Sequence, residues 1–84
     1  MTETKEIKKI VVWSRDNCPY CVRAKNLLSV KGLEYEERNI SEGVWSREQL
    51  LEACPGARTV PQIVMDGLVV GGYDRLEEYF KNES

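Results

Sequence analysis

Two cysteines in the segment Cys18-Pro19-Tyr20-Cys21 are the residues of this chain best suited to chemistry. They stand where an apolar run at residues 10–13, typical of a buried strand, gives way through turn-forming residues 14–17 to a helical pattern. Cys18 is therefore expected at a helix N-cap, where unpaired backbone N–H groups and the helix dipole stabilise a thiolate, the nucleophilic form of cysteine. With Cys21 one turn further on, the spacing predicts a redox-active pair.

Two other uses of a cysteine pair suit this sequence less well. A zinc site takes four ligands, and the chain supplies only one further cysteine, Cys54, and no histidine. A structural disulfide across so short a loop would remove little entropy from the unfolded chain, and the composition is not that of a disulfide-stapled secreted domain. Cys54 is expected to be a small buried hydrophobic residue, with a regulatory thiol as the alternative.

The composition narrows the class of protein. The 84 residues, 42% of them hydrophobic, are expected to form a single domain over residues 1–84 with a polar tail at 1–6. The formal net charge is −2 with positive residues spread along the chain, so neither nucleic-acid binding nor a polybasic membrane anchor is predicted. The opening residues lack the apolar core of a signal peptide, and no run is long enough to span a bilayer. A cytoplasmic location is expected, and that reducing compartment favours catalytic over architectural cysteines.

Periodicity and turn signals give the element order β-α-β-α-β-β-α. Strands are expected at residues 7–13, 33–39, 60–65 and 68–71, and helices at residues 19–31, from Ser46 to Pro55-Gly56, and from Asp74 onward. The second strand is rich in charged residues and is expected at a sheet edge. A β-α-β unit followed by a hairpin predicts an α/β, thioredoxin-like fold, a four-stranded mixed sheet with helices on both faces.

Local signals mark the ends of these elements. Gly32 is expected to stop the first helix, and Asp66-Gly67 is a strong hairpin signal. Ser46 and Gln49 predict a capping box, flanked by a hydrophobic staple, and Asp74 and Glu77 predict a second capping box.

Three segments together resemble the dithiol glutaredoxins. They are Cys18-Pro19-Tyr20-Cys21 with the following Val22-Arg23-Ala24-Lys25, then Thr59-Val60-Pro61-Gln62, then Gly71-Gly72-Tyr73-Asp74. The resemblance implies a glutathione-dependent thiol–disulfide oxidoreductase without a metal, which reduces protein disulfides and glutathione mixed disulfides. It implies that Cys18 is the nucleophile and Cys21 the resolving cysteine. The implied partners of the monomer are glutathione and disulfide-containing or glutathionylated proteins, with ribonucleotide reductase as one candidate.

The same resemblance implies a glutathione site. A cis Pro61 would face the active thiol and leave the backbone of Val60 free to pair with glutathione as a strand does. Backbone N–H groups at the start of the last helix would bind the γ-glutamyl carboxylate, and Arg15, with Arg58 as the weaker candidate, would bind the glycine carboxylate. The implied glutathione-binding residues are Arg15, Tyr20, Thr59, Val60, Pro61, Gly72, Tyr73 and Asp74.

One position departs from the family pattern. Arg75 stands where glutaredoxins commonly carry an aspartate, so weaker recognition of the glutathione ammonium is expected. Two other functions stay open: an electron donor fed by a thioredoxin reductase, and a dimeric iron–sulfur scaffold that shares glutathione. The Gly71-Gly72-Tyr73-Asp74 segment argues against the first. Pro19 argues against the second, because cluster-binding relatives usually lack that proline.

Overall fold

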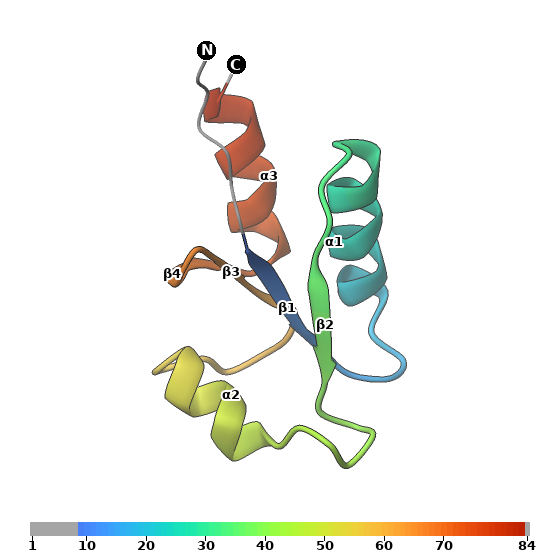
Figure 1. Ribbon diagram of the computed structural model, residues 1–84, viewed down its shortest axis with the longest axis vertical. Coiled ribbons are helices and arrows are strands. Elements are labelled where there is room, and N and C mark those ends of the chain that lie inside the picture. The colour runs from blue at the N-terminus through green and yellow to red at the C-terminus, as the bar shows by residue number, and fades with distance from the viewer. Residues whose placement is uncertain (1–8, 84) are drawn as a thin grey trace.

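The computed structural model describes residues 9–83, so the expected polar tail at 1–6 and the expected strand start at residue 7 lie outside the described residues. The elements follow the predicted order (Figure 1). They are β1 (Ile10–Ser14), α1 (Pro19–Val30), β2 (Glu36–Asn39), α2 (Arg47–Ala53), β3 (Gln62–Met65), β4 (Leu68–Gly71) and α3 (Tyr73–Glu83). None of the helices in the described part of the chain is long and apolar enough to cross a membrane.

The strands form one mixed sheet in the order β2-β1-β3-β4. β1 and β2 are parallel and are connected through α1, whereas β1 with β3 and β3 with β4 are antiparallel. β2 is an edge strand, as predicted, but it begins at Glu36 and not at residue 33. The reason is that the N–H of Leu33 donates a 3.0 Å hydrogen bond to the carbonyl of Leu28 in α1, which ties Leu33 to the end of the helix and not to the sheet.

Helices cover both faces of the sheet, as predicted. Alternate residues of β1 point to opposite faces, so that Val12 packs with α1 and α3 while Val11 packs with α2. Figure 1 shows α1 and α3 standing near each other, with α2 apart from them. The core under α1 and α3 consists of Ile10, Val12, Ala24, Leu28, Ile63, Met65 and Leu76. The smaller core under α2 consists of Val11, Trp13, Leu50 and Cys54.

Several predicted end signals are confirmed. Gly32 directly follows Lys31, the C-cap residue of α1, and has a φ of +76°. Its N–H donates to the Ser29 carbonyl at 2.9 Å. At the start of α2, the Gln49 N–H donates to the Ser46 hydroxyl at 3.1 Å, and the Gln49 side-chain oxygen accepts from the Ser46 N–H at 2.8 Å. Asp66 and Gly67 have φ values of 51° and 86°, the left-handed pair that a two-residue hairpin requires.

The predicted capping box at the start of the last helix is wrong. α3 begins at Tyr73, one residue earlier than expected, because the carbonyl of Gly72 accepts the first helical hydrogen bond from the Leu76 N–H at 3.0 Å. Asp74 therefore lies inside the first turn and does not cap it. The Glu77 carboxylate accepts a 3.2 Å hydrogen bond from the Tyr73 hydroxyl.

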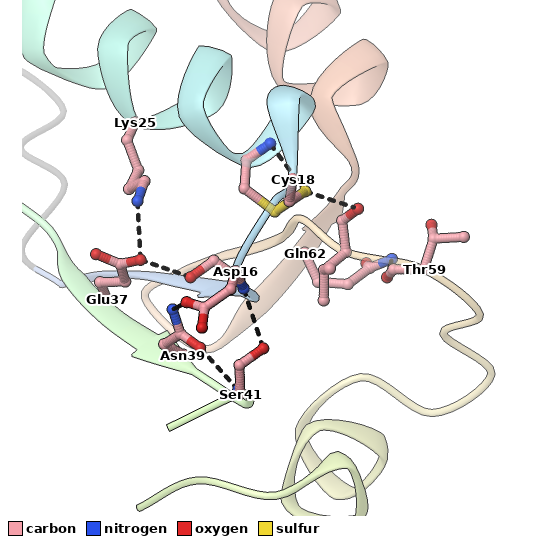
Figure 2. Close-up of a disulfide and its surroundings, with 11 residues drawn as sticks. Asp16, Cys18, Lys25, Glu37, Asn39, Ser41, Thr59 and Gln62 are labelled. Carbon is pink, nitrogen blue, oxygen red and sulfur yellow. Dashed lines mark hydrogen bonds and ion pairs between the residues drawn. A yellow bond between two sulfur atoms is a disulfide. The ribbon is translucent and has the colours of Figure 1, made fainter. Parts of the chain in front are cut away.

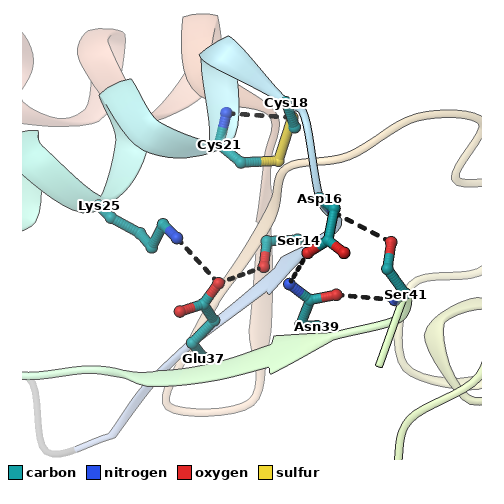
Figure 3. A network of polar contacts seen from close by, with 8 residues as sticks. All are labelled: Ser14, Asp16, Cys18, Cys21, Lys25, Glu37, Asn39 and Ser41. Carbon is teal, nitrogen blue, oxygen red and sulfur yellow. Dashed lines mark hydrogen bonds and ion pairs between the residues drawn. A yellow bond between two sulfur atoms is a disulfide. The ribbon is translucent and has the colours of Figure 1, made fainter. Parts of the chain in front are cut away.

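A polar contact ties the buried end of β1 to α1 and β2. The Ser14 hydroxyl, which is fully buried, donates to the Glu37 carboxylate at 2.6 Å, and the Lys25 ammonium donates to the same oxygen at 2.8 Å (Figure 3). The hydrogen bond from Lys25, and then that from Ser14, hold the pKa of Glu37 below its ordinary value of 4.5. The charged form of Glu37 is thus favoured by folding.

We predict that Glu37→Gln lowers the free energy of unfolding at neutral pH by about 1 kcal/mol, because the pair is only partly shielded from solvent. The folded-state pKa lies below the unfolded-state value, so this contribution is present above pH 4.5 and is lost as the pH falls through the folded-state pKa. Urea unfolding across this range measures it. Glu34→Gln, at an exposed position nearby in the sequence, is the control. If the Glu37→Gln protein is as stable as the parent at neutral pH, the contacts of Glu37 do not stabilise the fold.

Candidate active site

Cys18 occupies the N-cap of α1, as predicted. Its backbone is extended, with φ −124° and ψ 96°, and its carbonyl accepts the first helical hydrogen bond from the Val22 N–H at 3.1 Å. Its Sγ accepts a hydrogen bond from the Cys21 N–H at 3.2 Å. The sulfur therefore lies where helical N–H groups and the helix dipole favour negative charge.

The two cysteines are joined to each other by a disulfide (Figure 2). Their Cα atoms are 5.2 Å apart, within the range that a disulfide requires. Cys21 is 1% exposed, inside the first turn of α1, whereas Cys18 is 6% exposed at the start of that turn. The geometry supports a redox pair with Cys18 as the outer sulfur.

The segment before β3 lies against the disulfide. The Val60–Pro61 peptide bond is cis, as the family resemblance implied, and the Val60 carbonyl oxygen lies 3.7 Å from Cys18 Sγ. β3 begins at Gln62 and not at residue 60, because Pro61 has no N–H to donate to a strand ladder. No hydrogen bond within residues 9–83 uses the N–H of Val60. Gln62 steadies the segment by donating from its side-chain amide to the Thr59 carbonyl at 2.9 Å (Figure 2).

A second set of hydrogen bonds positions the loop that carries Arg15 to Cys18. The Asn39 side chain donates to the Asp16 carboxylate at 3.1 Å, and the Asp16 N–H donates to the Ser41 hydroxyl at 3.0 Å (Figure 3). Asn17 adopts a positive φ of 55°, which turns the chain into α1. The end of β2 thereby fixes the approach to the N-cap.

A groove of about 760 Å³ lies next to this disulfide: neither cysteine lines it, but Val60 does, and the Val60 carbonyl oxygen lies 3.7 Å from Cys18 Sγ. All eight expected glutathione-binding residues line it, although they come from four separate parts of the chain. They are Arg15, Tyr20, Thr59, Val60, Pro61, Gly72, Tyr73 and Asp74. The structure thus brings the predicted residues together, while their contact with glutathione stays a prediction.

The groove also contains residues that the sequence did not identify as site residues. Arg47 and Leu51 come from α2, and Ile40 comes from the segment after β2. Arg75, expected from the sequence to weaken recognition of the glutathione ammonium, lines the groove from the first turn of α3. Their membership depends on how α2 and α3 pack against the sheet, for which no local sequence signal exists. Arg58, considered only as the weaker carboxylate ligand, also lines the groove.

Two tyrosines from different helices meet at the groove. The rings of Tyr20 and Tyr73 have centroids 5.9 Å apart, and the guanidinium of Arg23 lies 5.2 Å from the Tyr20 ring centroid. Desolvation of the Tyr73 hydroxyl, together with the Glu77 carboxylate beside it, raises the pKa of Tyr73. At neutral pH Tyr73 therefore lines the groove as an uncharged side chain whose hydroxyl can donate a hydrogen bond.

The two glycines before α3 have different roles. Gly71 has a φ of +120°, and a Cβ there would lie 2.9 Å from Cγ of Arg75, so a side chain is excluded. Gly72 keeps an ordinary φ, and a Cβ there would lie 3.5 Å from the Pro61 carbonyl oxygen. The start of α3 is thus held close to the cis-proline segment.

Cys54 is buried and unpaired with another cysteine, as expected for a small hydrophobic residue. Burial raises the pKa of its thiol, which keeps it in the unreactive form. Within residues 9–83, no group of three or more His, Cys, Asp and Glu side chains is placed to hold a metal ion.

Comparison with known proteins agrees with this geometry. The family model for glutaredoxin matches residues 10–70. Glutaredoxin 1 of Rickettsia conorii is 41% identical over 68 residues, which make up 80% of this chain and 67% of the relative. Glutaredoxin 3 of Escherichia coli K12 is 40% identical over 67 residues, 80% of each chain.

Solved structures give the same result. The buckwheat glutaredoxin–glutathione complex has a TM-score of 0.78 and 30% sequence identity, over 88% of this chain and 69% of that chain. Reduced Escherichia coli glutaredoxin has a TM-score of 0.74 and 34% identity, over 89% of this chain and 95% of that chain.

The thioredoxin-like fold and its paired cysteines define a thiol–disulfide oxidoreductase. Within that class, the chain belongs to the glutaredoxin family.

We predict that in the reduced protein Cys18 reacts as a thiolate at neutral pH, because the helix N-terminus and the Cys21 N–H stabilise its negative charge. In a Cys21→Ser background, the rate of alkylation by iodoacetamide should reach half its maximum at a pH well below that of free cysteine. Arg15→Gln should move the curve to higher pH, and Lys31→Gln, at the far end of α1, should leave it in place. A curve like that of free cysteine contradicts the role of the N-cap.

Proposed function

We propose that this protein uses glutathione to reduce protein disulfides and glutathione mixed disulfides. The observation that carries the proposal is the groove beside Cys18, where the predicted anion-binding and strand-pairing groups lie together. The structural relative from buckwheat was solved as a glutaredoxin–glutathione complex, which supports the same ligand class.

Each part of glutathione has a counterpart in the groove. The first N–H groups of α3, which have no acceptor within the helix, suit the γ-glutamyl carboxylate. The free N–H and the carbonyl of Val60 suit the cysteine backbone, beside Cys18 Sγ. Arg15 is exposed at the groove and suits the glycine carboxylate through a charge-assisted hydrogen bond.

The reaction of a glutathionylated protein needs only one of the two cysteines. The Cys18 thiolate attacks the sulfur of the bound glutathione, the new disulfide forms, and the substrate thiolate leaves and takes up a proton. A second glutathione thiolate then attacks this mixed disulfide and releases glutathione disulfide with the Cys18 thiolate. Only one free glutathione is consumed in this reaction, because the other half of the glutathione disulfide comes from the substrate.

A protein disulfide requires both cysteines. Cys18 attacks one sulfur and forms a mixed disulfide with the substrate, and Cys21 then attacks Cys18 Sγ and releases the reduced substrate. This leaves the Cys18–Cys21 disulfide seen in the structure, which two glutathione molecules reduce. We extend the proposal to a monomeric, cytoplasmic protein, for which ribonucleotide reductase is one candidate substrate.

Substitution of the cysteines separates the two reactions. Cys18→Ser should abolish both, whereas Cys21→Ser should retain removal of glutathione from a peptide and lose most reduction of a protein disulfide. Coupled assays with glutathione and glutathione reductase measure both. Cys54→Ser is the matched control and should behave as the parent. Robust turnover by Cys18→Ser would refute the assignment, and turnover that needs no glutathione would refute the choice of reductant.

The position of Arg75 allows a test of ammonium recognition. With a small glutathione mixed disulfide that carries no charge on its other half, Arg75→Asp should lower KM a few-fold with little change in kcat, because an exposed pair contributes ~0.2–1 kcal/mol. Asp74→Ala should raise KM by a similar factor. Steady-state kinetics checks both, and a KM that rises in Arg75→Asp would make the arginine a ligand of glutathione itself.

A further inference from the structure

The groove beside the disulfide is strongly basic in a protein that is slightly acidic. Its lining includes Arg15, Arg47, Arg58 and Arg75 against the single carboxylate of Asp74, a formal charge of +3, whereas the whole chain carries −2. All four arginines are exposed. Positive charge is thus gathered where substrates must approach Cys18.

These arginines are not used to hold the fold together. None of the four groove arginines forms an ion pair with another described residue, whereas Lys9, Lys25 and Arg38 do. Their guanidinium groups are therefore available to a ligand, and each can bind a carboxylate through two parallel hydrogen bonds.

Glutathione does not account for all of this charge. Under the proposed function, Arg15 and the N-terminus of α3 already serve its two carboxylates, and its ammonium is repelled by further cations. Arg58 is the weaker candidate for the glycine carboxylate, and Arg47 and Arg75 remain, on α2 and α3, which cover opposite faces of the sheet.

The location of Arg75 is unfavourable for the helix that carries it. A cation in the first turn of α3 opposes the positive end of the helix dipole. Its aliphatic stem is packed close to the Cα of Gly71, where even a Cβ would collide with it. Arg75 thus lines the groove from a position where its charge is unfavourable for the helix.

We propose that this groove selects disulfide substrates in which acidic residues flank the reactive cysteine, and that Arg47 and Arg75 bind the flanking carboxylates. The partner is an acidic segment of a protein substrate. The inference rests on thiol–disulfide exchange at Cys18 and is independent of whether glutathione is the reductant.

A single turnover without glutathione tests the proposal. Reduced protein is mixed with one of two synthetic peptides, each with one internal disulfide, that differ only in having two Glu or two Gln residues beside one cysteine. The protein dithiol gives two electrons and two protons to the peptide and becomes the Cys18–Cys21 disulfide. Samples quenched with acid at successive times are assayed for the remaining protein thiols, which gives the rate constant for reduction of each peptide. This rate constant is divided by the rate constant for reduction of the same peptide by dithiothreitol, which corrects for the intrinsic reactivity of the peptide.

We expect the parent protein to reduce the acidic peptide about five-fold faster than the amide peptide at low salt, because two exposed ion pairs contribute modestly. The ratio should fall toward one as the salt concentration rises. Arg47→Gln and Arg75→Gln should each reduce it about two-fold, and the double variant should abolish it. Lys31→Gln removes the same charge outside the groove and should keep the full ratio.

Three results would overturn the proposal: equal rates for the two peptides, a preference that survives in the double variant, or an equal loss of preference in Lys31→Gln. If glutathione is the only ligand of these arginines, both variants alter turnover of a small glutathione mixed disulfide and leave the peptide ratio intact. Thermal unfolding of Arg75→Gln supplies a check on folding, and its midpoint should not fall, because a cation is removed from the helix N-terminus.

Discussion

The N-cap position of Cys18 is the constraint on which the rest of the structure depends. A sulfur at a helix N-terminus accepts an N–H that no other residue uses, and it gains the dipole of α1. β1 ends at Ser14, and the turn between Ser14 and Cys18 is fixed by a hydrogen bond from Asn39 of β2 to Asp16. The sheet and α1 can thus be understood as the support for one correctly placed sulfur.

The second requirement is an open backbone opposite that sulfur. Pro61 directly precedes β3 and cannot donate a ladder hydrogen bond, so the Val60 peptide stays outside the sheet. The Val60 carbonyl lies beside Cys18. Gly71 and Gly72 then bring the start of α3 to the same place. A strand-like backbone and a helix N-terminus therefore meet in one groove next to the reactive sulfur, although they are far apart in the sequence.

Local signals explain which features the sequence could predict. The N-cap role of Cys18, the stop at Gly32 and the capping box at Ser46 each depend on residues within one helical turn, and all three are confirmed. Where two local signals compete, the prediction fails: Asp74 is a good cap, but the Gly72 carbonyl already accepts the first bond of α3. The place of Arg47 in the groove could not be predicted, because it depends on packing between distant elements.

The unequal cores on the two faces of the sheet have a consequence for the groove. α1 and α3 share one large core, whereas α2 has seven residues and buries only Leu50. Local unfolding free energy follows the amount of apolar contact, so α2 is the element that opens most readily while the sheet remains intact. Because α2 forms one wall of the groove, we expect the width of the groove to vary more than the geometry around Cys18, which α1 and the sheet hold in place.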